Sequence, residues 1–211
     1  MSAVRWMIGA LMGSVSKILC DKVEKYLLSN RDKKSGHTRT EDVIVWMLMA
    51  VVGAVTVWRD GFGIYTLYKF LFFMLCEVIA MTDFHHRIIP NSLLLGLLMN
   101  RTGLLLSEMT GVIRTQEPSI VSLLIGLAVG GLLFFIPAVL SAEIGAGDIK
   151  LAAVLGFCLG ITDLLYVIVL AGVGILVYMF IQKIGMAKST LHSVIPLGPF
   201  LAAAAILIAN I

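Results

Sequence analysis

Two aspartates in this chain stand where apolar runs end, beside residues that leave room around a carboxylate. Asp148 lies in EIGAGDIK, 143–150, just after the uncharged run 120–140. Asp83 lies in AMTDFHHRIIPN, 80–91, where an earlier apolar run closes. Two carboxylates brought close together share one proton, so one can act as general base toward water while the other acts as general acid. These residues therefore predict hydrolytic chemistry of the aspartic protease type.

The residues around Asp148 favour an open approach to its carboxyl group. Gly145 and Gly147 have no side chains, which permits unusual backbone angles and lets another backbone approach closely. We therefore expect an extended peptide to be able to lie beside Asp148. Taken singly, each aspartate is also explained as a helix cap or a loop charge.

Composition shows which elements must position these acids. Apolar residues make up 59% of the 211 residues, charged residues only 14%, and the mean hydropathy is +0.99. Such values lie far outside the range of soluble globular proteins. We therefore expect an all-α, polytopic membrane protein, with residues 1–211 forming a single membrane domain. The net charge of +3 does not indicate nucleic-acid binding.

Apolar runs of roughly the length that crosses a bilayer, about 20 residues, divide the chain into about eight predicted helices. The sixth run is short and contains glycine, so seven spans and a re-entrant segment are the alternative. The first run is also compatible with a signal peptide, although a retained span explains the loop charges better. The expected spans are 3–19, 42–58, 63–82, 88–106, 119–140, 149–161, 163–182 and 194–211.

The distribution of lysine and arginine predicts the orientation, because these residues accumulate in cytoplasmic loops. With the N-terminus outside, the joints 20–41, 83–87, 141–150 and 183–193 are cytoplasmic and hold ten of these residues, whereas the opposite joints hold Arg59 and Arg114. Lys69 and Arg101 fall inside runs, and we expect both side chains to extend to the outer interface.

Several weaker features have simpler explanations. The cytoplasmic loop 20–42 is expected to begin as a short amphipathic helix and to break at Ser35–Gly36. The adjacent His85 and His86 point to different faces of a helix, so they are not expected to bind one metal ion together. We expect them to be polar interfacial residues, with proton tuning beside Asp83 as the alternative. The cysteines form no C-x-x-C pair and are expected to pack in the interior. The spacings 126–130 and 156–160 between glycines suit close helix packing but are common in membrane proteins.

Three segments in order resemble the type IV prepilin peptidases, GxGD-type intramembrane aspartic proteases of prokaryotes. In DFHHRIIPN, 83–91, an aspartate precedes a Pro-Asn pair by seven and eight positions. In GAGDIKLAAVLGFCLG, 145–160, the core G-x-G-D-x-K-L is followed by two further glycines. In IPLGPFLA, 195–202, two prolines flank Gly198 at the entrance of the last helix. The similarity covers residues 83–202.

The resemblance implies that Asp83 and Asp148 are the catalytic pair within peptidase core helices at 63–202. It implies cleavage of the leader peptide of a prepilin or pseudopilin at the cytoplasmic face of the inner membrane, without metal or cofactor. Gly145, Gly147 and Lys150 accompany Asp148 as residues near the substrate. Glu143 and Glu77 are candidates for contact with the cationic leader, although Glu77, about 9 Å along its helix from Asp83, also suits a hydrogen bond within the bundle.

The N-terminal part departs from the family pattern. Many bacterial relatives carry two C-x-x-C pairs between their first two spans, with the spacing of a structural zinc site. The corresponding loop here has only Cys20. The resemblance therefore extends to peptidase activity and does not extend to methylation of the new N-terminus.

Two other classes of function fit a polytopic chain with two acids. A proton-coupled transporter would place the carboxylates near the middle of the bilayer and would show symmetry between its halves. A scaffold of a pilus or secretion apparatus would keep the aspartates without using them. Proton flux or peptide cleavage by the purified protein distinguishes the three.

Overall fold

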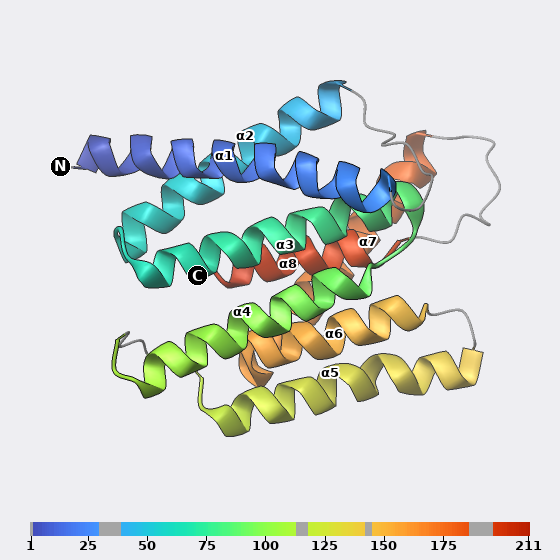
Figure 1. Cartoon of the computed structure of the whole chain (residues 1–211). Coiled ribbons are helices and arrows are strands. Elements are labelled where there is room, and N and C mark those ends of the chain that lie inside the picture. Colours follow the sequence, from blue (N-terminus) through green and yellow to red (C-terminus); the bar gives the residue numbers. More distant parts are fainter. Residues whose placement is uncertain (1, 30–38, 113–117, 142–144, 186–195) are drawn as a thin grey trace. The chain divides into compact units, whose positions relative to one another are not determined.

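The computed structural model describes residues 2–29, 39–112, 118–141, 145–185 and 196–211, which form eight helices and no strand (Figure 1). This result confirms the all-α prediction and the predicted number of helices. The helices are α1 (Ser2–Ser29), α2 (Arg39–Asp60), α3 (Ile64–His86), α4 (Asn91–Met109), α5 (Ile120–Ser141), α6 (Ala146–Leu159), α7 (Ile161–Gly185) and α8 (Gly198–Ile208).

Four helices are long and apolar enough to cross a membrane. Within the described residues these segments are Asp42–Asp60, Ile64–His86, Ile120–Leu140 and Ile161–Lys183. The helix at Gly198–Ile208 is apolar but shorter, and α6 has 14 residues. A length of about 20 apolar residues suffices to span the hydrocarbon core of a bilayer, so the fold is that of a multi-pass membrane protein. The direction of the chain through the membrane stays a prediction.

The first helix corrects the expected course of the loop after residue 20. The structure has no separate amphipathic helix there, because α1 continues without a break to Ser29. The segment from Lys17 to Ser29 contains neither glycine nor proline, the residues that most strongly interrupt a helix. The predicted break at Ser35–Gly36 lies outside the described residues.

The chain divides into two compact units, and unit 1 is built on a close contact between α1 and α2. Unit 1 comprises residues 1–78, 92–117 and 210–211. A β-carbon added to Gly53 would lie 2.4 Å from the carbonyl oxygen of Gly9, and one added to Gly13 would lie 2.1 Å from that of Met49. Only glycine permits such an approach of two helix backbones.

Polar side chains on α4 also pack inside unit 1. Arg101 is only 4% exposed, so the prediction that its side chain extends to the interface is wrong. Its neighbour Asn100 donates a hydrogen bond to the Tyr68 carbonyl at 3.1 Å, and the Tyr68 hydroxyl lies 3.2 Å from the Ser107 hydroxyl. This face of α4 therefore turns toward α3, whereas a snorkelling arginine needs a helix face directed toward lipid.

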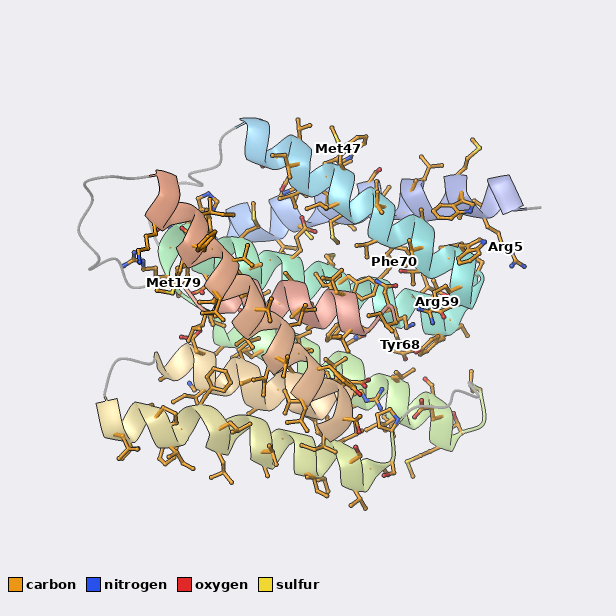
Figure 2. All side chains as sticks on the ribbon, turned by 180° about the vertical axis from the view of Figure 1, so that it is seen from behind. Arg5, Met47, Arg59, Tyr68, Phe70 and Met179 are labelled. Carbon is orange, nitrogen blue, oxygen red and sulfur yellow. The ribbon has the colours of Figure 1, made fainter. Side chains whose placement is uncertain are left out.

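One end of unit 1 gathers aromatic and basic side chains (Figure 2). The rings of Trp6 and Trp58 stack with centroids 5.9 Å apart. Arg59 donates to the backbone carbonyls of Asn210 and Ile211, and the half-buried Lys69 pairs with Asp60 at 2.7 Å. Tryptophan and basic residues together are typical of the boundary between membrane and water.

Unit 2 comprises residues 79–91 and 118–209, and α5 and α6 lie side by side within it (Figure 1). A β-carbon on Gly126 would lie 2.3 Å from the Gly156 oxygen, and one on Gly130 would lie 2.4 Å from the Ala152 oxygen. The glycine spacings singled out in the sequence therefore do allow close packing of α5. Gly160 serves differently, since it ends α6 with a φ of 84°.

Two adjacent glycines of α5 offer a matched test of this packing. We expect Gly130→Ala to lower the free energy of unfolding by about 1–3 kcal/mol, because the added methyl group meets backbone that cannot move aside. Gly131→Ala is the control, since its β-carbon would lie 3.5 Å from the Ala153 β-carbon, an ordinary contact. Thermal unfolding of both purified variants should show a lower midpoint for Gly130→Ala alone.

Candidate active site

Asp83 lies in the last turn of α3 and is held by the start of α8. Its side chain is 6% exposed, and its Oδ2 accepts a hydrogen bond from the backbone N–H of Gly198 at 3.0 Å. The chain leaves α3 directly afterwards through Arg87, whose φ of 53° is left-handed. The Arg87 N–H donates to the Asp83 carbonyl at 2.8 Å. The end of α3 thus fixes the backbone of Asp83, while α8 fixes its carboxylate.

The start of α8 explains why this contact needs glycine. Gly198 is the first residue of α8, and Pro199 follows in the first turn, where proline is well tolerated. A β-carbon on Gly198 would lie 2.5 Å from Asp83 Oδ2 and 2.9 Å from its Cγ. The approach of the Asp83 carboxylate to the helix N-terminus, where backbone N–H groups have no partner within the helix, therefore depends on the missing side chain.

Asp148, the second acid, lies in the first turn of α6 and belongs to unit 2, as Asp83 does. The helix begins after Gly145, which is extended at φ −66° and ψ 139°, and the Asp148 N–H donates to the Gly145 carbonyl at 3.0 Å. Asp148 Oδ1 is buried and has no hydrogen-bond partner among the residues that the structure describes. A buried carboxyl oxygen without a partner requires an explanation, and a site that receives water or a substrate group supplies one.

Burial and the negative charge of Asp83 raise the pKa of the Asp148 carboxyl to about 6, against the opposing effect of a hydrogen bond from the Gly145 backbone. Asp148 lies outside the four helices that are long enough to cross the membrane. The influence of Asp83 on this pKa means that the two acids, 65 positions apart in the chain, lie close enough within unit 2 to interact electrostatically.

The residues beside Asp148 connect α6 to the segment that follows Asp83. A β-carbon on Gly147 would lie 3.2 Å from the Ile89 β-carbon, so this glycine admits a neighbouring side chain. The Lys150 ammonium donates to Asn91 Oδ1 at 3.3 Å, linking α6 to the first residue of α4. Gly145 is exposed, and its β-carbon would lie 3.2 Å from Asp148 Oδ2. These contacts join the two aspartate-containing segments.

The two glutamates proposed for leader binding have different positions. Glu143 lies outside the described residues. Glu77 belongs to unit 1 and is 4% exposed. Its Oε1 lies 3.5 Å from the Lys17 ammonium, and its Oε2 accepts a hydrogen bond from the Cys20 thiol at 3.1 Å. Glu77 therefore has the bonding within the bundle that was the alternative, and its contact with a substrate stays a prediction.

The histidine and cysteine side chains of the described residues belong to no group of three or more possible metal ligands. His85 Nδ1 lies 3.1 Å from the Met81 carbonyl oxygen. Cys20, Cys76 and Cys158 are buried and are not joined in disulfides, and their burial confirms the prediction that they pack inside. Within the described part of the chain, no cluster of three or more histidine, cysteine, aspartate or glutamate side chains could hold a metal ion.

Sequence reasoning identified Asp83 and Asp148 but did not include two of their neighbours among the site residues. The Gly198 N–H donates to the Asp83 carboxylate, and Asn91 Oδ1 accepts a hydrogen bond from the Lys150 ammonium. Both stand in segments that had been noticed, Gly198 in IPLGPFLA and Asn91 in DFHHRIIPN. The available signal was glycine directly before proline at a helix start, which marks a position where a side chain is excluded.

Comparison with known proteins agrees with this arrangement. The model of the type IV leader peptidase family matches residues 70–180, just over half of the chain. This stretch contains both aspartates and the G-x-G-D segment. No curated protein and no solved structure shows a significant match. A family match over this length, which includes both acids, shows that the chain belongs to the type IV leader peptidase family.

Proposed function

We propose that the chain is an intramembrane aspartic endopeptidase in which Asp83 and Asp148 form the catalytic pair. Membership of the family implies aspartic peptidase activity and prepilin substrates. The observation that carries the assignment of the residues is that contacts between Gly147 and Ile89 and between Lys150 and Asn91 join the Asp148 segment to the segment after Asp83 within one compact unit. The substrate is the leader peptide of a type IV prepilin or pseudopilin, cut at the cytoplasmic face of the membrane.

The reaction needs one proton on the pair. The ionised carboxylate takes a proton from water while the water oxygen attacks the carbonyl carbon of the scissile bond. The protonated carboxyl gives its proton to the carbonyl oxygen, and a tetrahedral diol forms. When the carbon–nitrogen bond breaks, the amine nitrogen takes the proton that water lost, and a diol hydroxyl returns its proton to the pair. The products are a new carboxyl group and a new amine, and the enzyme is regenerated.

The surroundings of Asp148 suit a substrate that has left the helical state. A helical peptide uses its carbonyl groups in internal hydrogen bonds, so the scissile segment must unwind to be attacked. Gly145, at the exposed start of α6, leaves space beside Asp148 Oδ2, and the other carboxyl oxygen, Oδ1, has no partner among the described residues. Contact with the cationic leader falls to Glu143 in preference to Glu77, because the Glu77 carboxylate is already paired with Lys17.

The direct test is cleavage of a prepilin by the purified protein in liposomes. We expect a shorter pilin whose new N-terminus follows the glycine before the mature apolar helix, as determined by mass spectrometry. A prepilin in which that glycine is replaced serves as the control and should remain uncut. Proton flux without cleavage would support a transporter instead, and the absence of both activities would support a scaffold.

The pH dependence of the rate follows from the raised pKa of Asp148. Below about pH 6 the Asp148 carboxyl keeps its proton, which is then available for the carbonyl oxygen of the scissile bond. Above that value both acids ionise and no proton is available for the carbonyl oxygen. We expect kcat/KM to fall about tenfold per pH unit on the alkaline side, measured as initial rates in liposomes. A rate that is flat from pH 5 to 9 would contradict this mechanism.

A further inference from the structure

The two aspartates have unequal surroundings, and this difference bears on their roles. Asp83 Oδ2 accepts a hydrogen bond from the Gly198 N–H at the N-terminus of α8, an 11-residue helix. Hydrogen-bond donors and the positive end of a helix both favour the ionised form of a carboxyl group. Asp148 also lies in the first turn of a helix and has a hydrogen bond with the Gly145 backbone, but its Oδ1 is buried without a partner among the described residues, a setting that favours the neutral form.

The charged groups near the two aspartates also favour the ionised form of Asp83 over that of Asp148. Arg87, which follows the last residue of α3, brings a positive charge near the Asp83 carboxylate. The charged residues of α6 are Asp148 and Lys150, and the Lys150 ammonium donates to Asn91 Oδ1 at 3.3 Å. His85 is turned back toward the Met81 carbonyl of its own helix. Asp83 thus has a backbone donor and feels the positive charge of Arg87, whereas the charge that acts on Asp148 is the negative one of Asp83.

From this geometry we infer that Gly198 is a positioning residue that fixes Asp83 as the ionised general base, while Asp148 carries the shared proton as the general acid. The inference rests on the proposed function and adds the division of roles within it. Gly198 acts in two ways. Its N–H holds Oδ2 in place, and its missing side chain allows the approach, since a β-carbon would stand 2.5 Å from that oxygen.

The first test observes the order of ionisation in the wild-type protein. Aspartates labelled with ¹³C at the carboxyl carbon are followed by NMR across a pH titration. The signals are assigned by their loss in Asp83→Asn and in Asp148→Asn. We expect the Asp83 signal to titrate at lower pH than the Asp148 signal. Ionisation of Asp148 first, or of both together, would overturn the inference. This measurement does not depend on cleavage, so it stands apart from a failure of the proposed function.

The second test removes the close approach of Gly198. In Gly198→Ala the methyl group displaces the Asp83 carboxylate from its backbone donor. We expect cleavage to fall at least about 100-fold and the acid limb of the pH profile to move up by about one unit, the effect of one lost N–H donor on a carboxylate. A folding defect alone would lower the rate at every pH without moving the limb.

The matched control is Gly172→Ala on α7, because nothing lies within 4 Å of a β-carbon at this position. It should keep both the rate and the pH limbs of the wild type. If Gly198→Ala cleaves like the wild type with an unmoved acid limb, Gly198 has no positioning role. If Gly198→Ala does not fold, the order of ionisation in the wild type decides the inference.

Discussion

Replacing either aspartate, as Asp83→Asn or Asp148→Asn, is expected to lower the single-turnover rate of prepilin cleavage at least about 1,000-fold. Asparagine has nearly the shape of aspartic acid but can neither accept a proton from water nor donate one to the substrate. General acid–base catalysis by one positioned group contributes about 10²–10⁴-fold, and the two groups share one proton. Rates are measured in liposomes with enzyme in excess over substrate.

A matched control separates chemistry from folding in this experiment. Asp163 lies in the first turn of α7 in the same unit, and Asp163→Asn is expected to cleave at close to the wild-type rate. All three variants should unfold near the wild-type temperature, because Asp→Asn preserves side-chain volume. Near-normal cleavage by Asp83→Asn or by Asp148→Asn would remove that residue from the proposed chemistry.

Loss of the buried ammonium in Lys17→Met is expected to destabilise the fold strongly. Lys17 is 3% exposed and lies 3.5 Å from Glu77 Oε1 and 2.6 Å from Asp21 Oδ1. Removing one partner leaves a buried carboxylate without its counter-charge, which costs about 3–5 kcal/mol. The free energy of unfolding should fall by an amount of this order, measured by denaturant titration in detergent.

Two further variants show whether burial is the cause. The double variant Lys17→Met/Glu77→Gln removes both charges and should recover much of the loss, since replacing a buried pair is far milder than breaking it. Lys69→Met breaks the more exposed pair with Asp60 at 2.7 Å and should cost about 1 kcal/mol or less. Equal losses for Lys17→Met and Lys69→Met would mean that the Lys17 network is not effectively buried.

Helix content and approximate bounds could be predicted because they follow from local properties of the chain. The expected spans 119–140 and 163–182 correspond to α5 at Ile120–Ser141 and α7 at Ile161–Gly185. Long uncharged runs leave few alternatives to a helix in lipid, where backbone groups must be satisfied internally. The predicted end of the first span at residue 19 lies too early, because the charged residues after Lys17 suggest a loop, whereas nothing among them interrupts a helix and α1 continues to Ser29.

Side-chain pairing could not be predicted because it depends on tertiary contacts. Cys20 and Lys17 are 57 and 60 positions away from Glu77, and no spacing rule connects α1 with the middle of α3. Arg101 was expected near lipid because hydropathy does not reveal which face of α4 turns inward. Likewise, Gly9, Gly13 and Gly53 were not singled out, since small residues are frequent in membrane helices and only the packed partner shows which are needed.

The candidate site was predictable to the extent that it is encoded in short motifs. Asp83 and Asp148 stand in segments with a recognisable order of residues, and the family match covers both. The contact between Gly198 and Asp83 joins residues 115 positions apart and became visible only in the folded chain. Glycine is therefore needed before Pro199 because of the contact with Asp83, and not because of α8 itself.

The cleavage rate of the double variant Asp83→Asn/Asp148→Asn tests most directly whether the two acids act as one catalytic unit. Groups that share one step lose their contributions together, so their effects are strongly non-additive. We predict that the double variant cleaves no more slowly than the slower of the two single variants. Losses that multiply, with the double variant slower by the product of the two single effects, would show independent roles and contradict the account.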